Sequence, residues 1–95
     1  MIVRQVTLKV SPDRQEEFAT FWQTEYREAM ARQPGFVGAR LFKVAEANDE
    51  LQMMLEFKSE GEASAWRASA DHARLSPRLK SFSPLLTLKV LSPLA

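Results

Sequence analysis

The order of periodic segments along the chain constrains its fold more than any other feature. Residues 2–10 alternate with period two, which predicts a strand, and a stripe of apolar residues spaced by three and four then predicts a long helix. Residues 36–44 and 51–57 are two further predicted strands, joined by a polar connection short enough for an antiparallel hairpin. A second helical segment and a strand at residues 85–91 complete the chain. The predicted order is therefore β-α-β followed by β-α-β.

The ends of the helices have signals of their own. Ser-Pro-Asp at residues 11–13 predicts an N-cap, a proline at the first helical position and an acid where the helix dipole favours it. Gln-Pro-Gly at residues 33–35 predicts the end of this helix. Ser-Glu-Gly-Glu at residues 59–62 has the spacing of a capping box and predicts the start of the second helix. Residues 75–84 contain two prolines, so we expect a short irregular crossing there instead of more helix.

The right-handed crossover rule leaves one economical arrangement for this order of elements. It is a four-stranded antiparallel sheet in the order 4-1-3-2 with both helices on one face, which is the ferredoxin-like plait of the α+β class. We expect a single domain over residues 1–95. A core of this size is close to the lower limit for a domain without disulfides or metals, so association would add to its stability.

Alternation along the strands assigns each side chain to one of two sheet faces. The face expected under the helices comprises Val6, Leu8, Val10, Leu51, Met53, Leu55, Phe57, Leu86, Leu88 and Val90. The opposite face comprises Val3, Gln5, Thr7, Met54, Glu56, Leu85, Thr87 and Leu91. Each apolar side chain of this second face stabilises by about 1.5–3 kcal/mol when buried, so we predict a homodimer in which two such faces pack together. The alternative is a face polar enough to remain in water.

Composition excludes several functional classes. The formal net charge is +1, and basic residues are scattered among acidic ones without a basic run, so we expect no nucleic-acid partner. The chain has no cysteine, which excludes disulfides, thiolate metal sites and a cysteine nucleophile. Charged residues interrupt every apolar stretch well before the roughly 18 residues of a membrane span, and the first residues lack a secretory pattern. We therefore expect a soluble, cytoplasmic protein.

Two segments resemble a known family. They are Pro-Gly-Phe-Val-Gly-Ala-Arg-Leu-Phe at residues 34–42 and the helical segment of residues 57–72, which contains Trp-x-x-Ser-x-x-His. Together, in this order of elements, they resemble the antibiotic biosynthesis monooxygenase family. The resemblance implies a dimeric α+β barrel with a pocket between sheet and helices in each subunit. Some members oxidise aromatic polyketides or quinols with oxygen and no metal or flavin, others bind and open haem, and many have no established substrate.

Oxygenation without a cofactor requires a substrate that itself gives an electron to oxygen. The protein must bind an aromatic phenol, favour its anion and exclude water. An aromatic wall, a group that takes the phenolic proton and a cation that stabilises the anion would meet these requirements. The candidate catalytic residues are Trp66, His72 and Tyr26, and the candidate substrate-binding residues are Arg40, Trp22, Phe42 and Arg67.

Each candidate also has a structural explanation. Trp66 shares a predicted helical stripe with Ala63, Ala70 and Ala73, which indicates core packing. His72 follows Trp66 by about 600° of helix rotation, which places it off that stripe and near the predicted helix end. Arg40 has Glu56 available as an ion-pair partner on the neighbouring strand.

The resemblance transfers only in part, residue by residue. Polyketide-oxidising members carry Asn, Trp and Tyr along the second helix, where this chain has Glu62, Trp66 and His72. Haem-degrading members carry Asn in the first strand, the same Trp and a later His, where this chain has Gln5, Trp66 and Ser76. We therefore expect no cofactor and keep haem as an alternative. The leading hypothesis is a monooxygenase for an aromatic quinol or polyphenol, and the other is a ligand-binding or regulatory dimer without catalysis.

Overall fold

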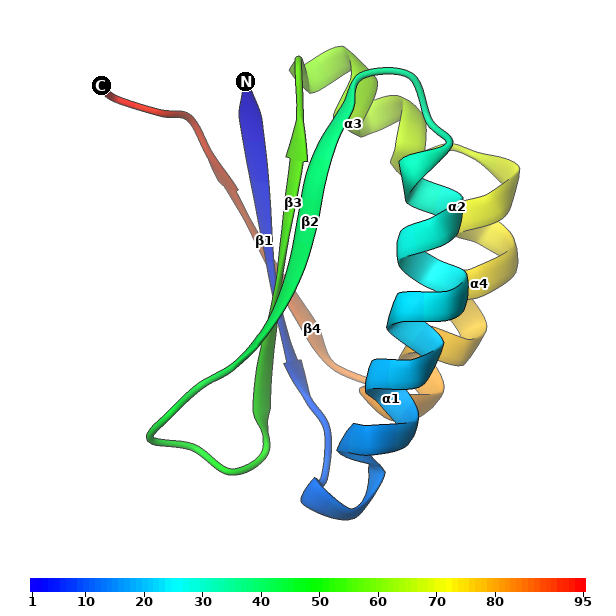
Figure 1. The fold of residues 1–95 in the computed structure, drawn as a ribbon, viewed down its shortest axis with the longest axis vertical. Coiled ribbons are helices and arrows are strands. Elements are labelled where there is room, and N and C mark those ends of the chain that lie inside the picture. Colours follow the sequence, from blue (N-terminus) through cyan, green and yellow to red (C-terminus); the bar gives the residue numbers. More distant parts are fainter.

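The sheet contains four antiparallel strands, β1 (Ile2–Lys9), β2 (Phe36–Lys43), β3 (Glu50–Phe57) and β4 (Leu86–Leu91). The computed structural model describes all residues from 1 to 95. The strand order is β2-β3-β1-β4, which confirms the predicted 4-1-3-2 arrangement. All helices lie on one side of the sheet (Figure 1), so the ferredoxin-like plait is confirmed as well.

The first helical region is one continuous rod of four segments. A 3-10 turn, η1 (Pro12–Arg14), leads into α1 (Gln15–Phe21), a π-helical turn η2 (Trp22–Tyr26) and α2 (Arg27–Ala31). The predicted N-cap is wrong in one respect, because the Ser11 side chain forms no capping hydrogen bond and the helix starts instead as a 3-10 turn. The predicted end is confirmed, since Gly35 adopts φ 79°, a left-handed conformation that favours glycine.

The second helical region is two helices, α3 (Glu60–Arg67) and α4 (Ala70–Phe82). The predicted start is confirmed, because the Ser59 hydroxyl accepts a hydrogen bond from the Glu62 amide at 3.2 Å. The expected irregular crossing over residues 75–84 is wrong, since α4 continues through Pro77 to Phe82. Proline inside a helix costs about 3 kcal/mol. The cost is outweighed by burial of Leu75, Leu79 and Phe82 on one side of α4, at about 1.5–3 kcal/mol each.

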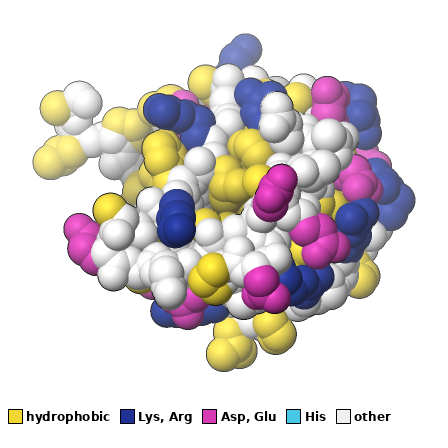
Figure 2. Space-filling model, turned by 60° about the horizontal axis from the view of Figure 1, so that its bottom comes forward, with side chains coloured by type: hydrophobic (Ala, Val, Ile, Leu, Met, Phe, Trp, Pro, Cys, Tyr) yellow, Lys and Arg dark blue, Asp and Glu magenta, His cyan; other side chains and the backbone are white.

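The core lies between the helix-side face of the sheet and the helices. Its aromatic part joins the two helical regions, because the Phe82 ring packs edge-on against Phe18 at 5.2 Å and stacks with Phe21 at 5.7 Å between ring centroids. On the molecular face shown in Figure 2, acidic and basic side chains are interspersed. None of the helices is long and apolar enough to cross a membrane.

The sheet face away from the helices is uncovered (Figure 1). It is more polar than the alternation suggested, since Gln5 donates a side-chain hydrogen bond to Gln52 at 2.9 Å across β1 and β3. Leu85, which was assigned to this face from the sequence, precedes β4 and lies outside the strands. The expected ion pair between Arg40 and Glu56 is wrong, because the Arg40 guanidinium packs 4.8 Å from the ring centroid of Phe42 and forms no ion pair.

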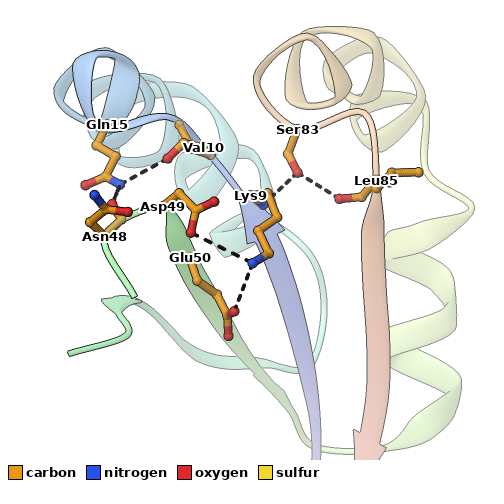
Figure 3. Close-up of polar contacts among 8 residues, drawn as sticks. All are labelled: Lys9, Val10, Gln15, Asn48, Asp49, Glu50, Ser83 and Leu85. Atoms are coloured by element: carbon orange, nitrogen blue, oxygen red, sulfur yellow. Dashed lines mark hydrogen bonds and ion pairs between the residues drawn. The ribbon is translucent and has the colours of Figure 1, made fainter. Parts of the chain in front are cut away.

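A group of polar contacts lies at the end of the sheet where β1 connects to the first helical region (Figure 3). The buried Ser83 hydroxyl accepts a hydrogen bond from the Lys9 amide at 2.9 Å and donates one to the Leu85 carbonyl at 2.8 Å. The Gln15 amide group donates to the carbonyls of Val10 at 3.0 Å and Asn48 at 2.6 Å. These contacts fix α4 and the start of β4 to the end of β1.

We expect Ser83→Ala to lower the free energy of unfolding by about 1–3 kcal/mol, because the amide of Lys9 and the carbonyl of Leu85 lose a buried partner. Urea denaturation followed by circular dichroism measures this loss. Ser81→Ala is the matched control, since the Ser81 side chain is exposed and bonds only the Arg78 carbonyl within its own helix. Equal denaturation midpoints for the two variants would contradict this role of Ser83.

Candidate functional site

A cavity of about 210 Å³ lies between the sheet and the helices. It is lined by 13 residues, of which eight are hydrophobic. Six of these eight are not aromatic and come from the helix-side face of the sheet and from α4, namely Val6, Met53, Leu55, Leu79, Leu86 and Leu88. The remaining lining residues are aromatic, polar or basic, namely Arg4, Tyr26, Trp66, Arg67, His72, Ser76 and Lys80. The cavity is therefore shaped for an apolar ring and carries its polar groups on the helix side and at Arg4.

The three candidate catalytic residues meet at this cavity. The ring centroids of Trp66 and His72 lie 5.3 Å apart, and those of Trp66 and Tyr26 lie 5.5 Å apart, both in edge-to-face arrangements. The Tyr26 and His72 rings are 6.5 Å apart. Three elements contribute one residue each, η2, α3 and α4. Trp66 is almost fully buried, so it packs in the core and lines the cavity at the same time.

A break between α3 and α4 brings His72 to Trp66. The Ser69 hydroxyl accepts a hydrogen bond from the His72 amide at 3.1 Å and donates one to the Trp66 carbonyl at 2.7 Å. Ser69 thus caps α4 as a new helix, and the rotation expected for one continuous helix does not apply. The expected position of His72 away from Trp66 is wrong, and the helix end near which it lies is the start of α4 and not the end of a continuous helix. The predicted stripe ends at Trp66, since Ala70 and Ala73 are exposed.

Tyr26 ends the π-helical turn η2, a local widening of the helix that is frequent at functional sites. Burial raises the pKa of its hydroxyl to about 12, and the nearby Trp66 indole and the charge of Arg67 oppose this shift only in part. Tyr26 therefore keeps its proton throughout the neutral range. In this form its hydroxyl can donate a hydrogen bond to a ligand oxygen.

This raised pKa predicts a loss of stability in alkali. The folded-state pKa lies above the ordinary value of 10.0, so the contribution of Tyr26 is complete below pH 10 and is lost as the pH rises through 12. We expect the free energy of unfolding to fall by up to roughly 2–3 kcal/mol over this range, because each pKa unit corresponds to about 1.4 kcal/mol. Urea denaturation at several pH values measures it, with Tyr26→Phe as the reference without a phenol.

A second measurement observes the hydroxyl of Tyr26 directly. Tyr26 is the only tyrosine, so the phenolate absorbance reports on this residue alone. We expect its midpoint well above pH 10. An ordinary midpoint would contradict the buried position of the hydroxyl.

His72 is half-buried at the cavity wall. Removal from water lowers the pKa of its imidazole, and the positive charges of Arg67, Lys80 and Arg4 lower it further. The imidazole is therefore neutral at neutral pH and can accept a proton from a bound ligand.

The four candidate binding residues are divided by the sheet. Arg67 lines the cavity. Arg40 and Phe42 lie opposite Met54 and Gln52 in the sheet register, on the uncovered face, so neither reaches the cavity. Trp22 is buried in the core outside the cavity lining, and its indole nitrogen has no hydrogen-bond partner.

Sequence reasoning missed Arg4. This residue of β1 is 7% exposed and lines the cavity. Its Nη2 donates to the Glu60 carboxylate at 2.8 Å and to the Ser64 hydroxyl at 3.2 Å. The hydrogen bond from Arg4 lowers the pKa of Glu60. The strand alternation could have identified Arg4 as a cavity residue. Residue 4 alternates in phase with Val6 and Leu8, so its side chain had to lie on the face under the helices.

The structure contains no group of three or more His, Asp or Glu side chains that could hold a metal ion. Gln5, the counterpart of the strand Asn of haem-degrading proteins, lies on the uncovered sheet face and bonds Gln52. Ser76, the counterpart of their histidine, lines the cavity with a hydroxyl instead of an imidazole. The histidine that haem-degrading proteins carry at this position is therefore absent, and His72 is the only histidine at the cavity.

A family model described as antibiotic biosynthesis monooxygenase matches residues 1–78. No curated protein sequence gives a significant match. Among solved structures, the chain is similar to a monooxygenase from the gene ActVA-Orf6 of Streptomyces coelicolor in complex with the ligand nanaomycin D. The TM-score is 0.86 at 19% identity, with 99% of this chain and 88% of that chain covered.

Two further solved structures are similar. One is a mutant of SnoaB, a cofactor-independent oxygenase from Streptomyces nogalater, with a TM-score of 0.81 at 16% identity and coverage of 99% of this chain and 93% of that chain. The other is a conserved protein from Methanosarcina mazei Go1, with a TM-score of 0.81 at 19% identity and coverage of 96% and 91%. At these identities the likeness concerns the fold.

Proposed function

The chain belongs to the antibiotic biosynthesis monooxygenase family, and from this premise we propose that it is a cofactor-independent monooxygenase of small aromatic phenols or quinols. The observation that supports the proposal most is the meeting of Tyr26, Trp66 and His72 at one largely apolar cavity. Similar folds are found in a cofactor-independent oxygenase and in a monooxygenase in complex with the ligand nanaomycin D.

The proposed reaction needs only the substrate and oxygen. With 1-naphthol as the example, a phenolate anion gives an electron to oxygen, and the two radicals combine at the ring carbon opposite the phenolic oxygen. The resulting hydroperoxide loses water and leaves 1,4-naphthoquinone. One oxygen atom enters the ring and the other leaves as water, while the substrate supplies all four electrons. No external reductant is therefore required.

Four side chains have distinct parts in this proposal. Neutral His72 accepts the phenolic proton, because its pKa is lowered. Arg67 stabilises the phenolate, and the protonated Tyr26 hydroxyl donates a hydrogen bond to the phenolate oxygen or to the peroxide. Trp66 provides the wall against which the ring packs.

Oxygen consumption by the purified protein tests the proposal. We expect uptake above the rate without protein when 1-naphthol is added, and formation of 1,4-naphthoquinone in an amount equal to the oxygen consumed. Metal chelators should leave the rate unchanged. If no member of a panel of naphthols and hydroquinones raises oxygen uptake, while these compounds still raise the melting temperature, the domain is a binding protein without catalysis.

Haem does not fit the cavity as it stands. Pockets for drug-sized ligands begin at about 300 Å³, and haem is a large ligand even in that class, whereas this cavity measures about 210 Å³. The counterpart of the iron-ligating histidine is Ser76. A Soret band after addition of hemin would contradict this conclusion.

We also propose that two chains pair through the uncovered sheet face. Val3 lies beside Leu91 in the sheet register, and Met54 lies beside Gln5 on the same face. Burial of these apolar side chains would favour association, and the polar residues between them can bond across the contact.

Met54→Lys should convert the dimer to a monomer, because burial of a lysine charge in the contact costs free energy. Light scattering coupled to gel filtration at micromolar concentration measures the mass. Leu85→Lys is the control, since Leu85 is exposed and lies outside the strands. A wild-type protein with the mass of one chain would refute the proposed pairing.

A further inference from the structure

We propose that the cavity selects aromatic ligands that carry a carboxylate, and that Arg4 is the buried anchor for this group. The inference rests on the proposed function only for the phenolic part of the substrate. The anion site itself rests on the charges, the unused hydrogen-bond donors and the volume of the cavity, each of which is an independent observation.

The charged residues of the cavity lining all have the same sign. Arg4, Arg67 and Lys80 are basic, and no Asp or Glu is among the lining residues. Arg67 and Lys80 also form no ion pair with any other residue of the chain. This arrangement exceeds what a neutral phenol requires, and it matches a ligand with a permanent negative charge.

Arg4 has guanidinium hydrogen-bond donors that no other residue of the chain uses. It lies in a strand on the floor of the site and is 7% exposed, and only its Nη2 donates hydrogen bonds. Its Nε is buried without a partner. An unpaired buried donor of a charged group costs free energy, and a ligand oxygen beside it would remove this cost. A charged guanidinium donor without a partner in the chain can bind a carboxylate oxygen through a charge-assisted hydrogen bond.

Glu60 forms an ion pair with Arg4 from outside the cavity. Its carboxylate is half-exposed and contacts the Arg4 Nη2 at 2.8 Å, and it is not among the cavity-lining residues. Glu60 therefore orients the guanidinium and neutralises part of its charge from outside the site. Removal of the Glu60 carboxylate should therefore increase the affinity of the cavity for an anion. If the pair between Arg4 and Glu60 only stabilised the fold, its removal would not increase this affinity.

The volume limits the size of the ligand. An apolar cavity of about 150 Å³ holds a benzene molecule. The present cavity is larger, at about 210 Å³, but smaller than the roughly 300 Å³ at which sites for drug-sized ligands begin. A ligand of one or two rings with a single carboxylate therefore suits it.

Anaerobic calorimetric titration tests the inference without turnover. The matched pair of probes is 1-hydroxy-2-naphthoate and 1-hydroxy-2-naphthamide, which share ring, hydroxyl and shape but differ in charge. We expect the carboxylate to bind at least roughly 10-fold more tightly than the amide, as for a charge-assisted contact. Equal dissociation constants for acid and amide would overturn the proposal.

Three variants locate the effect. Arg4→Met should bring the ratio of the two dissociation constants close to one. Glu60→Gln should raise the ratio several-fold, because Arg4 then keeps its full charge, and this exposed substitution is not expected to unfold the protein. Lys58→Gln removes one exposed positive charge outside the cavity and should leave the ratio unchanged. If Glu60→Gln lowers the ratio or leaves it unchanged, Arg4 is not the anchor.

Oxygen uptake with the same two probes separates this inference from the proposed function. Preferential binding of the acid without oxygen uptake would refute the monooxygenase and retain the anion site. Oxidation of both probes at equal kcat/KM would retain the monooxygenase and refute the anion site.

Discussion

Replacement of His72 by glutamine should lower the kcat for 1-naphthol oxidation by about 100-fold or more, the contribution typical of a general base. Glutamine keeps the size and polarity of the side chain but cannot accept the phenolic proton. Neutral His72 can accept it, since burial and three nearby cations lower the pKa of the imidazole. Initial rates of oxygen uptake with saturating substrate measure the effect.

The pH profile distinguishes a base from a merely structural histidine. Because the pKa of His72 is lowered, we expect the wild-type rate to fall only when the pH drops below the ordinary histidine value of about 6.5. The residual rate of His72→Gln should lack this decline. Ala73→Gln is the control, because Ala73 is exposed and follows His72 on the same helix. A His72→Gln variant with the wild-type rate and profile would exclude His72 as the base.

The topology was predictable because it depends on information that lies along the chain. Alternation defined the strands, turn residues such as Gly35 defined their connections, and the crossover rule left one arrangement of the sheet. The capping box at Ser59 was predictable for the same reason, since cap and amide are three residues apart. The local signal of Pro77 was wrong because packing outweighed it: the buried side of α4 retains the helix.

The candidate site was predictable in its residue types and less so in its geometry. His72 reaches Trp66 because Ser69 ends one helix and caps the next, and a rotation calculated for a continuous helix cannot include such a break. Arg4 was missed because its partner Glu60 is distant in sequence and becomes a neighbour only when α3 packs on β1. Arg40 failed as a cavity residue because the bulge between Phe36 and Gly38 sets the register of β2.

Phe18→Ala should lower the free energy of unfolding by about 3–5 kcal/mol, the range for removal of a fully buried aromatic side chain. Phe18 is completely buried, and its ring lies 5.2 Å from that of Phe82 and 6.2 Å from that of Phe21 between centroids. Domains of this size are stable by only about 5–15 kcal/mol in total, so the loss is a large part of the whole. Urea denaturation measures it, with Thr20→Ala on the exposed side of α1 as the control.

The same substitution should also weaken ligand binding. Phe18 contacts the last turn of α4 through Phe82, and α4 carries His72, Ser76 and Lys80 of the cavity wall. A void beside Phe82 would loosen this end of α4 against the first helical region, so that part of the binding energy would be needed to order the cavity wall. We therefore expect a higher dissociation constant for 1-hydroxy-2-naphthoate at a temperature where the variant is still folded. An unchanged constant would show that the aromatic cluster stabilises the fold without positioning the site.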